Sequence, residues 1–227
     1  MARIAAMTDA DSAMVSAAVT AVERHTAGEV VTIVTAQSDD YADIAMLWSI
    51  LAAFLALAAL ALFADFYLGL YDQMTGGWTQ QWHPRGLFAL ALLVASLKFA
   101  GMWLLQLWPP LRLLLVPAPV KHTRVRARAV TCFKVGAERR THGRTGILIY
   151  LSMHEHRAEI VADEAIASKV APEVWGEAMA AMLVHIREGR IGDGLVAAIG
   201  KVGEVLAEHF PLAEGDINEL PDRLIEV

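Results

Sequence analysis

The most constraining feature of the chain is an uncharged segment of 21 residues, IAMLWSILAAFLALAALALFA, between Asp43 and Asp65. At about 1.5 Å of rise per residue, a helix of this length extends about 30 Å, which is the thickness of the hydrocarbon core of a bilayer. A surface helix of a soluble protein keeps a polar face, and this segment has none. We therefore expect a transmembrane helix over about residues 44–64.

A second apolar segment, GLFALALLVASLKFAGMWLLQLW, predicts another transmembrane helix from Gly86 to Trp108. Its one charge is Lys98, and a lysine at the bilayer centre costs about 2.5–3.5 kcal/mol. The surrounding Leu, Phe and Val residues each return about 0.3–0.6 kcal/mol, so insertion of the segment stays favourable. Lys98 is either a functional charge inside a helix bundle or oligomer, or a lysine that snorkels or is masked by a neighbour.

Flanking residues indicate how the two segments lie in a membrane. Pro109–Pro110 ends the second helix, and four tryptophans suit the interfacial aromatic belts: Trp78, Trp82, Trp103 and Trp108. The loop between the segments has Arg85 as its only Lys or Arg. Five basic residues follow the second segment closely: Arg112, Lys121, Arg124, Arg126 and Arg128. The positive-inside rule therefore predicts a multi-pass protein of the bacterial inner membrane with both termini in the cytoplasm.

Composition excludes several other classes of protein. The chain is 56% hydrophobic, and the excess lies in the two apolar segments. A single cysteine, Cys132, excludes an intrachain disulfide, and the N-terminal sequence MARIAAMTDADSAMV lacks the apolar core of a signal peptide. The net charge of −6 does not suggest nucleic-acid binding. The basic cluster adjoins a predicted span, so anionic lipid head groups are its nearest partners.

The two polar arms are expected to form one α/β domain interrupted by the transmembrane hairpin. The N-terminal arm predicts a helix capped by Thr8, followed by the strand EVVTIVTAQ. The C-terminal arm predicts a helix from about Val120 to Arg140, the strands GILIYLS and RAEIVAD, and two helices, PEVWGEAMAAMLVHIREG and GDGLVAAIGKVGEVLAEHF. One helix and one strand cannot bury enough surface alone. The expected parts are therefore residues 1–42, the hairpin at 43–110, and residues 111–227.

Several stretches of the two arms resemble the TPM domain family, in its bacterial membrane-protein branch. They are AGEVVTIVTA, HGRTGILIYLSMHEHRAEIVADEAI with Trp175, REGRIGDGLVAAIGKVGEVLAEHFP and NELPDRLIEV, within residues 8–42 and 112–227. The resemblance implies an α/β/α sandwich, here interrupted by the two-helix hairpin. It also implies membrane tethering, and the family has been linked to acid phosphatase activity, calcium binding, and the assembly or repair of membrane complexes.

An acidic set is the first candidate site. Asp39 and Asp40 follow the first predicted strand, and Asp163 and Glu164 follow the third. If those strands are parallel, all four carboxylates lie at one edge of the sheet, where ligands of open α/β sheets bind. Carboxylate and carbonyl oxygens suit calcium or magnesium. We therefore expect either a site for one of these cations or ordinary polar loop residues before a membrane helix.

Two further groups are weaker candidates. His154 and His156 flank Glu155 in the turn between two strands, and both imidazoles can approach one metal. The sequence offers no HExxH motif and no cysteine pair as further zinc ligands, so a polar hairpin turn is the alternative. Arg139, Arg140 and Arg144 either hold an anion or are solvated near the membrane surface. No residue is assigned a catalytic role.

Three functions remain open. The sequence favours a membrane-anchored interaction or assembly module at the cytoplasmic face, whose partners are the bilayer, another membrane protein, or further copies of the same chain. The alternative is a phosphatase that depends on a divalent cation held by carboxylates at the strand ends. Transport through two spans requires many protomers and is the weakest hypothesis.

Overall fold

A computed structural model describes residues 7–75, 83–136, 145–171, 173–212 and 222–227. The chain divides into two compact units, which are described separately. The first unit combines residues 1–39 with residues 118–227 and is called the α/β unit below. The second unit comprises residues 40–117 and is called the helical unit. The chain thus combines a mixed α/β fold with two long apolar helices.

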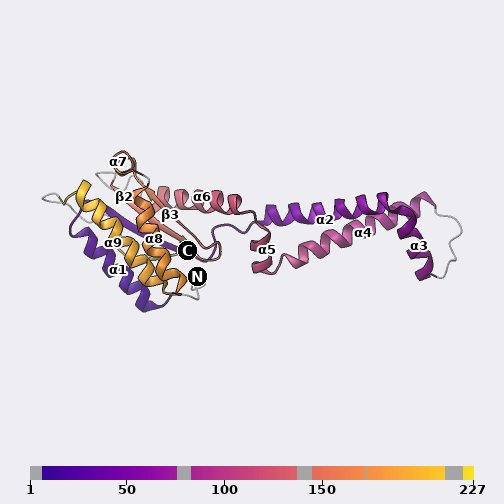
Figure 1. The fold of residues 1–227 in the computed structure, drawn as a ribbon, viewed down its shortest axis with the longest axis horizontal. Helices are drawn as coiled ribbons and strands as arrows, with labels where there is room; N and C mark the ends of the chain where they lie inside the picture. The colour runs from indigo at the N-terminus through magenta and orange to yellow at the C-terminus, as the bar shows by residue number, and fades with distance from the viewer. Residues whose placement is uncertain (1–6, 76–82, 137–144, 172, 213–221) are drawn as a thin grey trace. The chain divides into compact units, whose positions relative to one another are not determined.

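A mixed four-stranded sheet is the centre of the α/β unit (Figure 1). The strands are β1 (Glu29–Thr35), β2 (Gly146–Ser152), β3 (Arg157–Ala162) and β4 (Ile225–Glu226), in the order β3-β2-β1-β4. β1 is parallel to β2 and to β4, whereas β3 is antiparallel to β2. The expected pairing of the first strand with a strand beyond the apolar segments is confirmed. β1 and β2 are buried along their whole length, which explains their continuous hydrophobic sequences.

One face of the sheet packs against α1 (Asp9–Glu23), α8 (Val174–Arg187) and α9 (Ile191–His209). The core on this face joins alternate strand residues, such as Val30 and Val34, to Val19 of α1 and Leu195 of α9. The predicted Thr8 cap is confirmed, because its hydroxyl accepts a hydrogen bond from the Asp11 amide at 3.1 Å. The Asp11 carboxylate accepts one in return from the Thr8 amide at 2.9 Å. This reciprocal capping box fixes the start of α1.

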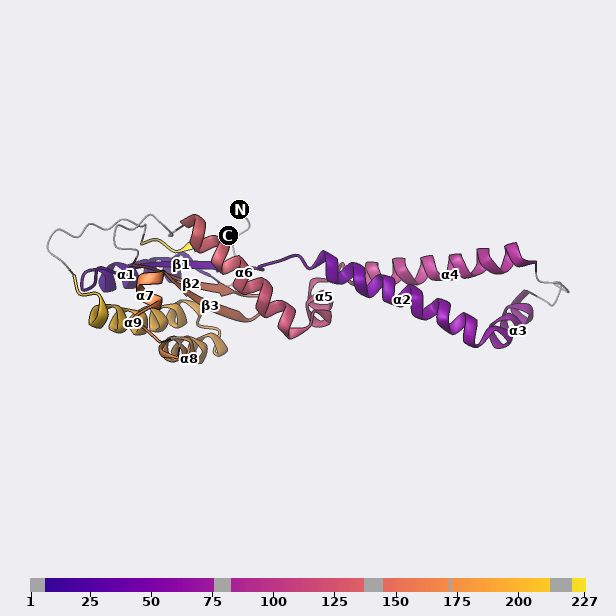
Figure 2. The ribbon, with the colours of Figure 1, turned by 90° about the horizontal axis from the view of Figure 1, so that it is seen from above.

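The opposite face of the sheet packs against α6 (Ala118–Gly136) (Figure 2). The expected apolar face of this helix is confirmed, because Val125, Ala129 and Phe133 are buried against the sheet and Cys132 is partly buried beside them. The strand residues on this side are the alternate set, including Val31 of β1 and Leu148 of β2. The short α7 (Glu164–Ala167) and the short β4 were not predicted.

The helical unit contains α2 (Ala42–Leu62), α3 (Ala64–Thr75), α4 (Pro84–Leu105) and α5 (Pro109–Leu115). α2 and α4 pack side by side (Figure 1), and both are long and apolar enough, by length and composition, to cross a membrane. Residues 65–75, expected to belong to a loop, form all but the first residue of α3. The second apolar helix was expected to reach Trp108, but it ends at Leu105. Pro109 then begins α5, because its fixed φ suits the first turn of a helix.

Polar side chains connect the first turns of α2 to the residues that follow α4. The buried Gln106 amide donates hydrogen bonds to the carbonyl of Ala45 at 3.0 Å and to that of Met102 at 3.1 Å. The indole N–H of Trp48 donates to the carbonyl of Leu115 at 3.0 Å. These bonds connect α2 to the segments at the end of α4. Trp78 and Trp82 lie outside the described residues.

Candidate functional site

The four predicted cation ligands are not brought together. β3 runs antiparallel to β2, and β2 is parallel to β1, so the carboxyl end of β3 meets the amino end of β1. The Asp163 amide donates to the carbonyl of Gly146 at 2.9 Å, and Gly146 pairs with Glu29, the first residue of β1. Asp39 and Asp40 follow the other end of β1. The hypothesis that the first and third strands are parallel is therefore wrong.

Separate roles account for three of the four acids. The Asp39 carboxylate lies 3.1 Å from the Arg124 guanidinium, and the Asp40 carboxylate accepts a hydrogen bond from the Ala42 amide at 3.1 Å, at the start of α2. Asp163 is buried and precedes Glu164, the first residue of α7; its carboxylate accepts from the Gly146 amide at 3.2 Å. Within the described parts of the chain, no three His, Cys, Asp or Glu side chains form a group able to hold a metal ion. The four residues predicted to bind calcium or magnesium therefore do not form one ligand set.

The turn that contains His154 and His156 is organised by the glutamate between them. The Glu155 side chain is buried, and its two oxygens accept hydrogen bonds from the Ser38 amide at 2.8 Å and the Ser152 hydroxyl at 2.5 Å. His154 and His156 are exposed, and His156 has a positive φ of 51°. The spacing of the two histidines in the sequence suggested a metal site formed by their imidazoles. The partner that reveals the role of Glu155, Ser38, is 117 residues away in the chain.

A hydrogen-bonded cluster surrounds Glu155 beyond the carboxyl ends of β1 and β2. The Ser38 hydroxyl lies 3.0 Å from the Tyr150 hydroxyl and donates to Ser152 at 2.9 Å. Burial is the main cause that raises the pKa of Tyr150, and the hydrogen bond with Ser38 opposes it. Ligands of open α/β sheets often bind at such a position. Here the polar groups bind one another, so the cluster fastens the turn after β2 to the segment that follows β1.

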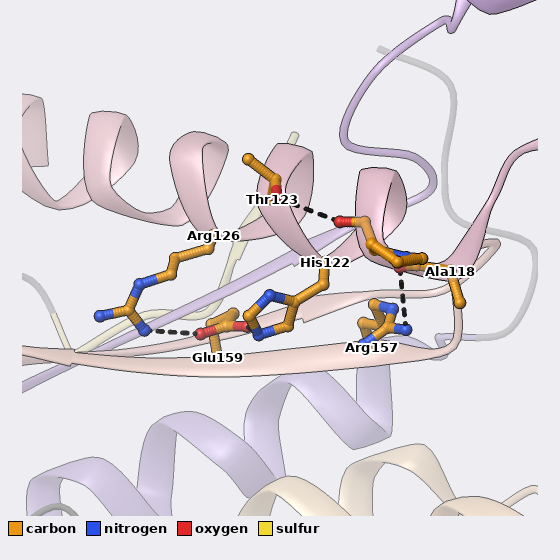
Figure 3. Close-up of polar contacts among 7 residues, drawn as sticks. Ala118, His122, Thr123, Arg126, Arg157 and Glu159 are labelled. Atoms are coloured by element: carbon orange, nitrogen blue, oxygen red, sulfur yellow. Dashed lines mark hydrogen bonds and ion pairs between the residues drawn. The ribbon is translucent and has the colours of Figure 1, made fainter.

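A second polar group connects β3 to α6 (Figure 3). Glu159 of β3 lies 3.3 Å from the Arg126 guanidinium and 3.5 Å from the His122 imidazole. The Glu159 side chain is 11% exposed, whereas Arg126 and His122 are 61% and 55% exposed. Arg157 donates to the carbonyl of Ala118 at 3.3 Å, near the start of α6. The carboxylate is therefore covered by the protein, and the basic groups face solvent.

A groove of about 390 Å³ follows β3 on the side away from β2. Its floor is formed by residues of β3 from Ala158 to Ala162, and Arg126 of α6 lies at one rim. The opposite wall is apolar and contains Val170, Trp175 and Met179. This groove combines an accessible strand edge, an aromatic side chain and exposed basic groups, so we take it as the candidate binding site of the α/β unit. Sequence patterns did not reveal it, because α6, β3 and α8 each contribute one part.

Lys98 occupies a groove in the helical unit. It is exposed on α4, and the groove around it is also lined by Ala52 and Gly101. The expected aromatic residues Trp103 and Trp108 are exposed at the end of this apolar segment. The three arginines predicted as an anion site, at positions 139, 140 and 144, lie outside the described residues.

Comparison with known proteins bears on the fold alone. No protein-family model and no curated protein matches the chain. A solved structure is similar: the NMR structure of the BA42 protein from the psychrophilic bacterium Bizionia argentinensis sp. nov.. The match covers 100% of both chains with a TM-score of 0.56 and 18% sequence identity. At this identity the likeness extends to the arrangement of helices and strands.

Proposed function

We propose that this chain is a membrane-anchored interaction module, with a TPM-like α/β/α sandwich held at the cytoplasmic face of a bacterial inner membrane. The observation that carries the proposal is the exposure of apolar side chains on α2 and α4. Phe54, Phe88 and Leu92 are 65%, 76% and 69% exposed. Large apolar surfaces of this kind are rare on soluble monomers and mark membrane or protein contacts.

The length and connectivity of the helical unit support anchoring. The 21 residues of α2 extend about 30 Å, which matches the hydrocarbon core. β1 and β2 pair in one sheet although α2 and α4 lie between them in sequence. Two crossings return the chain to the side from which it started, so a two-span hairpin is compatible with this pairing. An odd number of crossings is not.

The distribution of basic residues supports a cytoplasmic location of the α/β unit. α6 carries Lys121, Arg124, Arg126 and Arg128 and contains no Asp or Glu. Basic residues close to a transmembrane helix favour the cytoplasmic side. Anionic head groups on that side attract them by about 1 kcal/mol for each residue near the surface. The lipid surface is accordingly one expected partner of the module.

Interaction is favoured over catalysis by the arrangement of polar groups. The hypothesis of a cation-dependent phosphatase required the four carboxylates to lie together, but they lie at opposite ends of the sheet. The buried Glu155 is held by hydrogen bonds within the protein. An accessible strand edge beside an apolar groove is instead typical of a surface that binds another protein. The resemblance to TPM domains, which are linked to the assembly of membrane complexes, agrees with this function.

Photocross-linking in living cells tests the function. A photoreactive amino acid at His122, beside the candidate groove, is expected to cross-link reproducibly to one membrane-associated protein. A control at Lys201, on the exposed side of α9, should not give that product. The same cross-link from both positions, or none from His122, would contradict an interaction module that uses this face. Extraction of the membranes with alkaline carbonate should leave the chain in the pellet.

A further inference from the structure

The free edge of the sheet presents backbone hydrogen-bonding groups. β3 is the last strand in the order, so one of its edges has no strand neighbour within the described residues. In an antiparallel pair, alternate residues bond to the partner strand and the others point away. The Asp163 amide bonds to the carbonyl of Gly146 on the β2 side. Every second residue before it, namely Val161, Glu159 and Arg157, therefore also bonds to β2. The N–H and C=O groups of Ala158, Ile160 and Ala162 therefore face the open edge.

The groove beside this edge has one apolar wall that lies on the same side of the sheet as α8. Trp175 and Met179 of α8 and Val170 line it. The side chains of Ala158, Ile160 and Ala162 face this side and pack partly against the core. At Gly176, which also lines the groove, an added Cβ would meet no atom within 4 Å. There is consequently free space for apolar side chains of a chain that adds to β3.

The other side of the edge carries exposed positive charge. Arg157, Glu159 and Val161 alternate on the face that packs against α6. Glu159 is covered and already paired with Arg126 and His122, so the groups that meet solvent here are basic. An added strand places every second side chain on this face. Acidic side chains at those positions would lie near Arg126 and Arg157.

We propose that the β3 edge binds an extended segment of a partner protein as an additional strand, with apolar and acidic residues alternating along it. Apolar side chains enter the groove beside Trp175 and Met179, and acidic side chains face Arg126 and Arg157. The inference rests on the proposed function and specifies the partner's chemistry. A second copy of the chain fits this edge less well, because its own Arg126 and Arg157 would lie near the same two arginines of the first copy and repel them.

Binding of synthetic peptides to the full-length protein in nanodiscs tests this assignment. The probe is a short acetylated peptide of alternating isoleucine and glutamate, followed by fluorescence anisotropy. We expect saturable binding, with affinity about tenfold lower when lysine replaces glutamate, because the charge near Arg126 is then repelled. Hydrogen exchange at the amides of Ala158, Ile160 and Ala162 should slow about tenfold when the peptide saturates the protein.

Two variants localise the site. Gly176→Leu fills the groove at a position where the added side chain has room, and Ala158→Pro removes an outward N–H from an edge strand, where proline is tolerated. Each should weaken peptide binding about tenfold. Gly200→Leu is the control for the first, because Gly200 is an exposed helical glycine of α9 with equally open surroundings. Its peptide affinity should stay at the wild-type value, and neither glycine variant should melt below the wild-type temperature.

Three results would overturn the assignment. They are the absence of saturable binding of the isoleucine–glutamate peptide, full affinity in both Gly176→Leu and Ala158→Pro, and a dimer in light scattering that Gly176→Leu dissociates. The last result would assign the edge to a second copy. Flotation of the protein with liposomes is measured in parallel, because anchoring depends on the helical unit. Loss of peptide binding with intact flotation refutes the strand site alone, whereas failure to float refutes the membrane-anchored module.

Discussion

Two apolar helices, α9 and α4, meet opposite surroundings. In α9, nine of 19 residues are buried, and they pack against α1, α8 and the sheet. In α4, all 22 residues are described and none is buried, although the helix contains 11 leucine or alanine residues and α9 contains five. The difference shows that apolar composition alone does not create a protein core. The α/β unit supplies the apolar surroundings of α9, whereas α4 packs against α2 and leaves apolar side chains such as Phe88 and Leu92 exposed.

The largest difference is expected from leucine deletions in the two helices. Leu206 of α9 is fully buried, so Leu206→Ala should lower the free energy of unfolding of the α/β unit by about 2–5 kcal/mol. Leu92 of α4 is 69% exposed. Leu92→Ala should leave that free energy unchanged. Hydrogen exchange of the β1 and β2 amides in detergent measures both. Equal losses in the two variants would break the comparison.

An arginine introduced at two equally exposed positions, one in α4 and one in the α/β unit, distinguishes the surroundings of these positions directly. Leu93 of α4 and Val184 of α8 are 55% and 56% exposed. Leu93→Arg should oppose membrane insertion by about 3–4 kcal/mol, because leucine favours the bilayer centre and arginine opposes it. Val184→Arg faces water and should change stability by less than about 0.5 kcal/mol. The fraction retained after carbonate extraction reports the first effect and thermal unfolding the second. If Leu93→Arg stays fully membrane-bound, α4 does not face lipid at that position.

Much of the difference between the α/β unit and the apolar helices could be predicted from the sequence. The uncharged segment that became α2, the continuous hydrophobic strands β1 and β2, and the Thr8 cap each carry a strong local signal. The short elements α3, α5 and β4 carry weaker signals. β4 has only two residues, and its pairing with β1 depends on chain segments far apart in sequence.

The candidate sites were less predictable, for reasons that differ between them. The four-residue connection between β2 and β3 permits only antiparallel pairing. The parallel pairing of β1 with β2, which then places Asp39 and Asp163 at opposite ends of the sheet, was not predicted from the sequence. The groove beside β3 could not be found in this way. It depends on Arg126, Trp175 and the β3 edge, and no local pattern predicts that these three lie together.

Glycines sharpen the comparison at the level of close packing. A Cβ on Gly203 of α9 would lie 2.6 Å from Val22 of α1, whereas one on Gly101 of α4 would meet nothing within 4 Å. Gly203→Ala should therefore destabilise the α/β unit by about 1–3 kcal/mol. Gly101→Ala should be neutral or stabilise its helix by up to about 1 kcal/mol. Thermal unfolding in detergent distinguishes them, and a stabilised Gly203→Ala would show that α1 and α9 pack less closely.

The smallest effect concerns a charge at the edge of the α/β core. Burial is the main cause that raises the pKa of Glu23 from 4.5 to about 8, with Glu29 and Asp222 adding to it, while the hydrogen bond from the Val30 amide opposes it. The folded state thus retains a proton that the unfolded state releases. The contribution of Glu23 to stability should be largest below about pH 4.5 and decline as pH rises towards about 8.

A series of unfolding measurements between these pH values tests this dependence. Solvent screens a partly exposed group, so the change should be modest. Glu23→Gln, which is uncharged at every pH, should flatten the profile. A profile of unchanged slope in Glu23→Gln would assign the dependence to another group.

The central claim, that α2 and α4 cross a bilayer and leave the α/β unit on the cytoplasmic side, is tested most directly by cysteine labelling. In a Cys132→Ser background, Gln73→Cys marks α3 between the apolar helices and Lys201→Cys marks α9. A membrane-impermeant maleimide is applied to right-side-out and inside-out vesicles. We predict that Gln73→Cys reacts only in right-side-out vesicles and Lys201→Cys only in inside-out vesicles. Reaction of both cysteines from the same face would contradict the account.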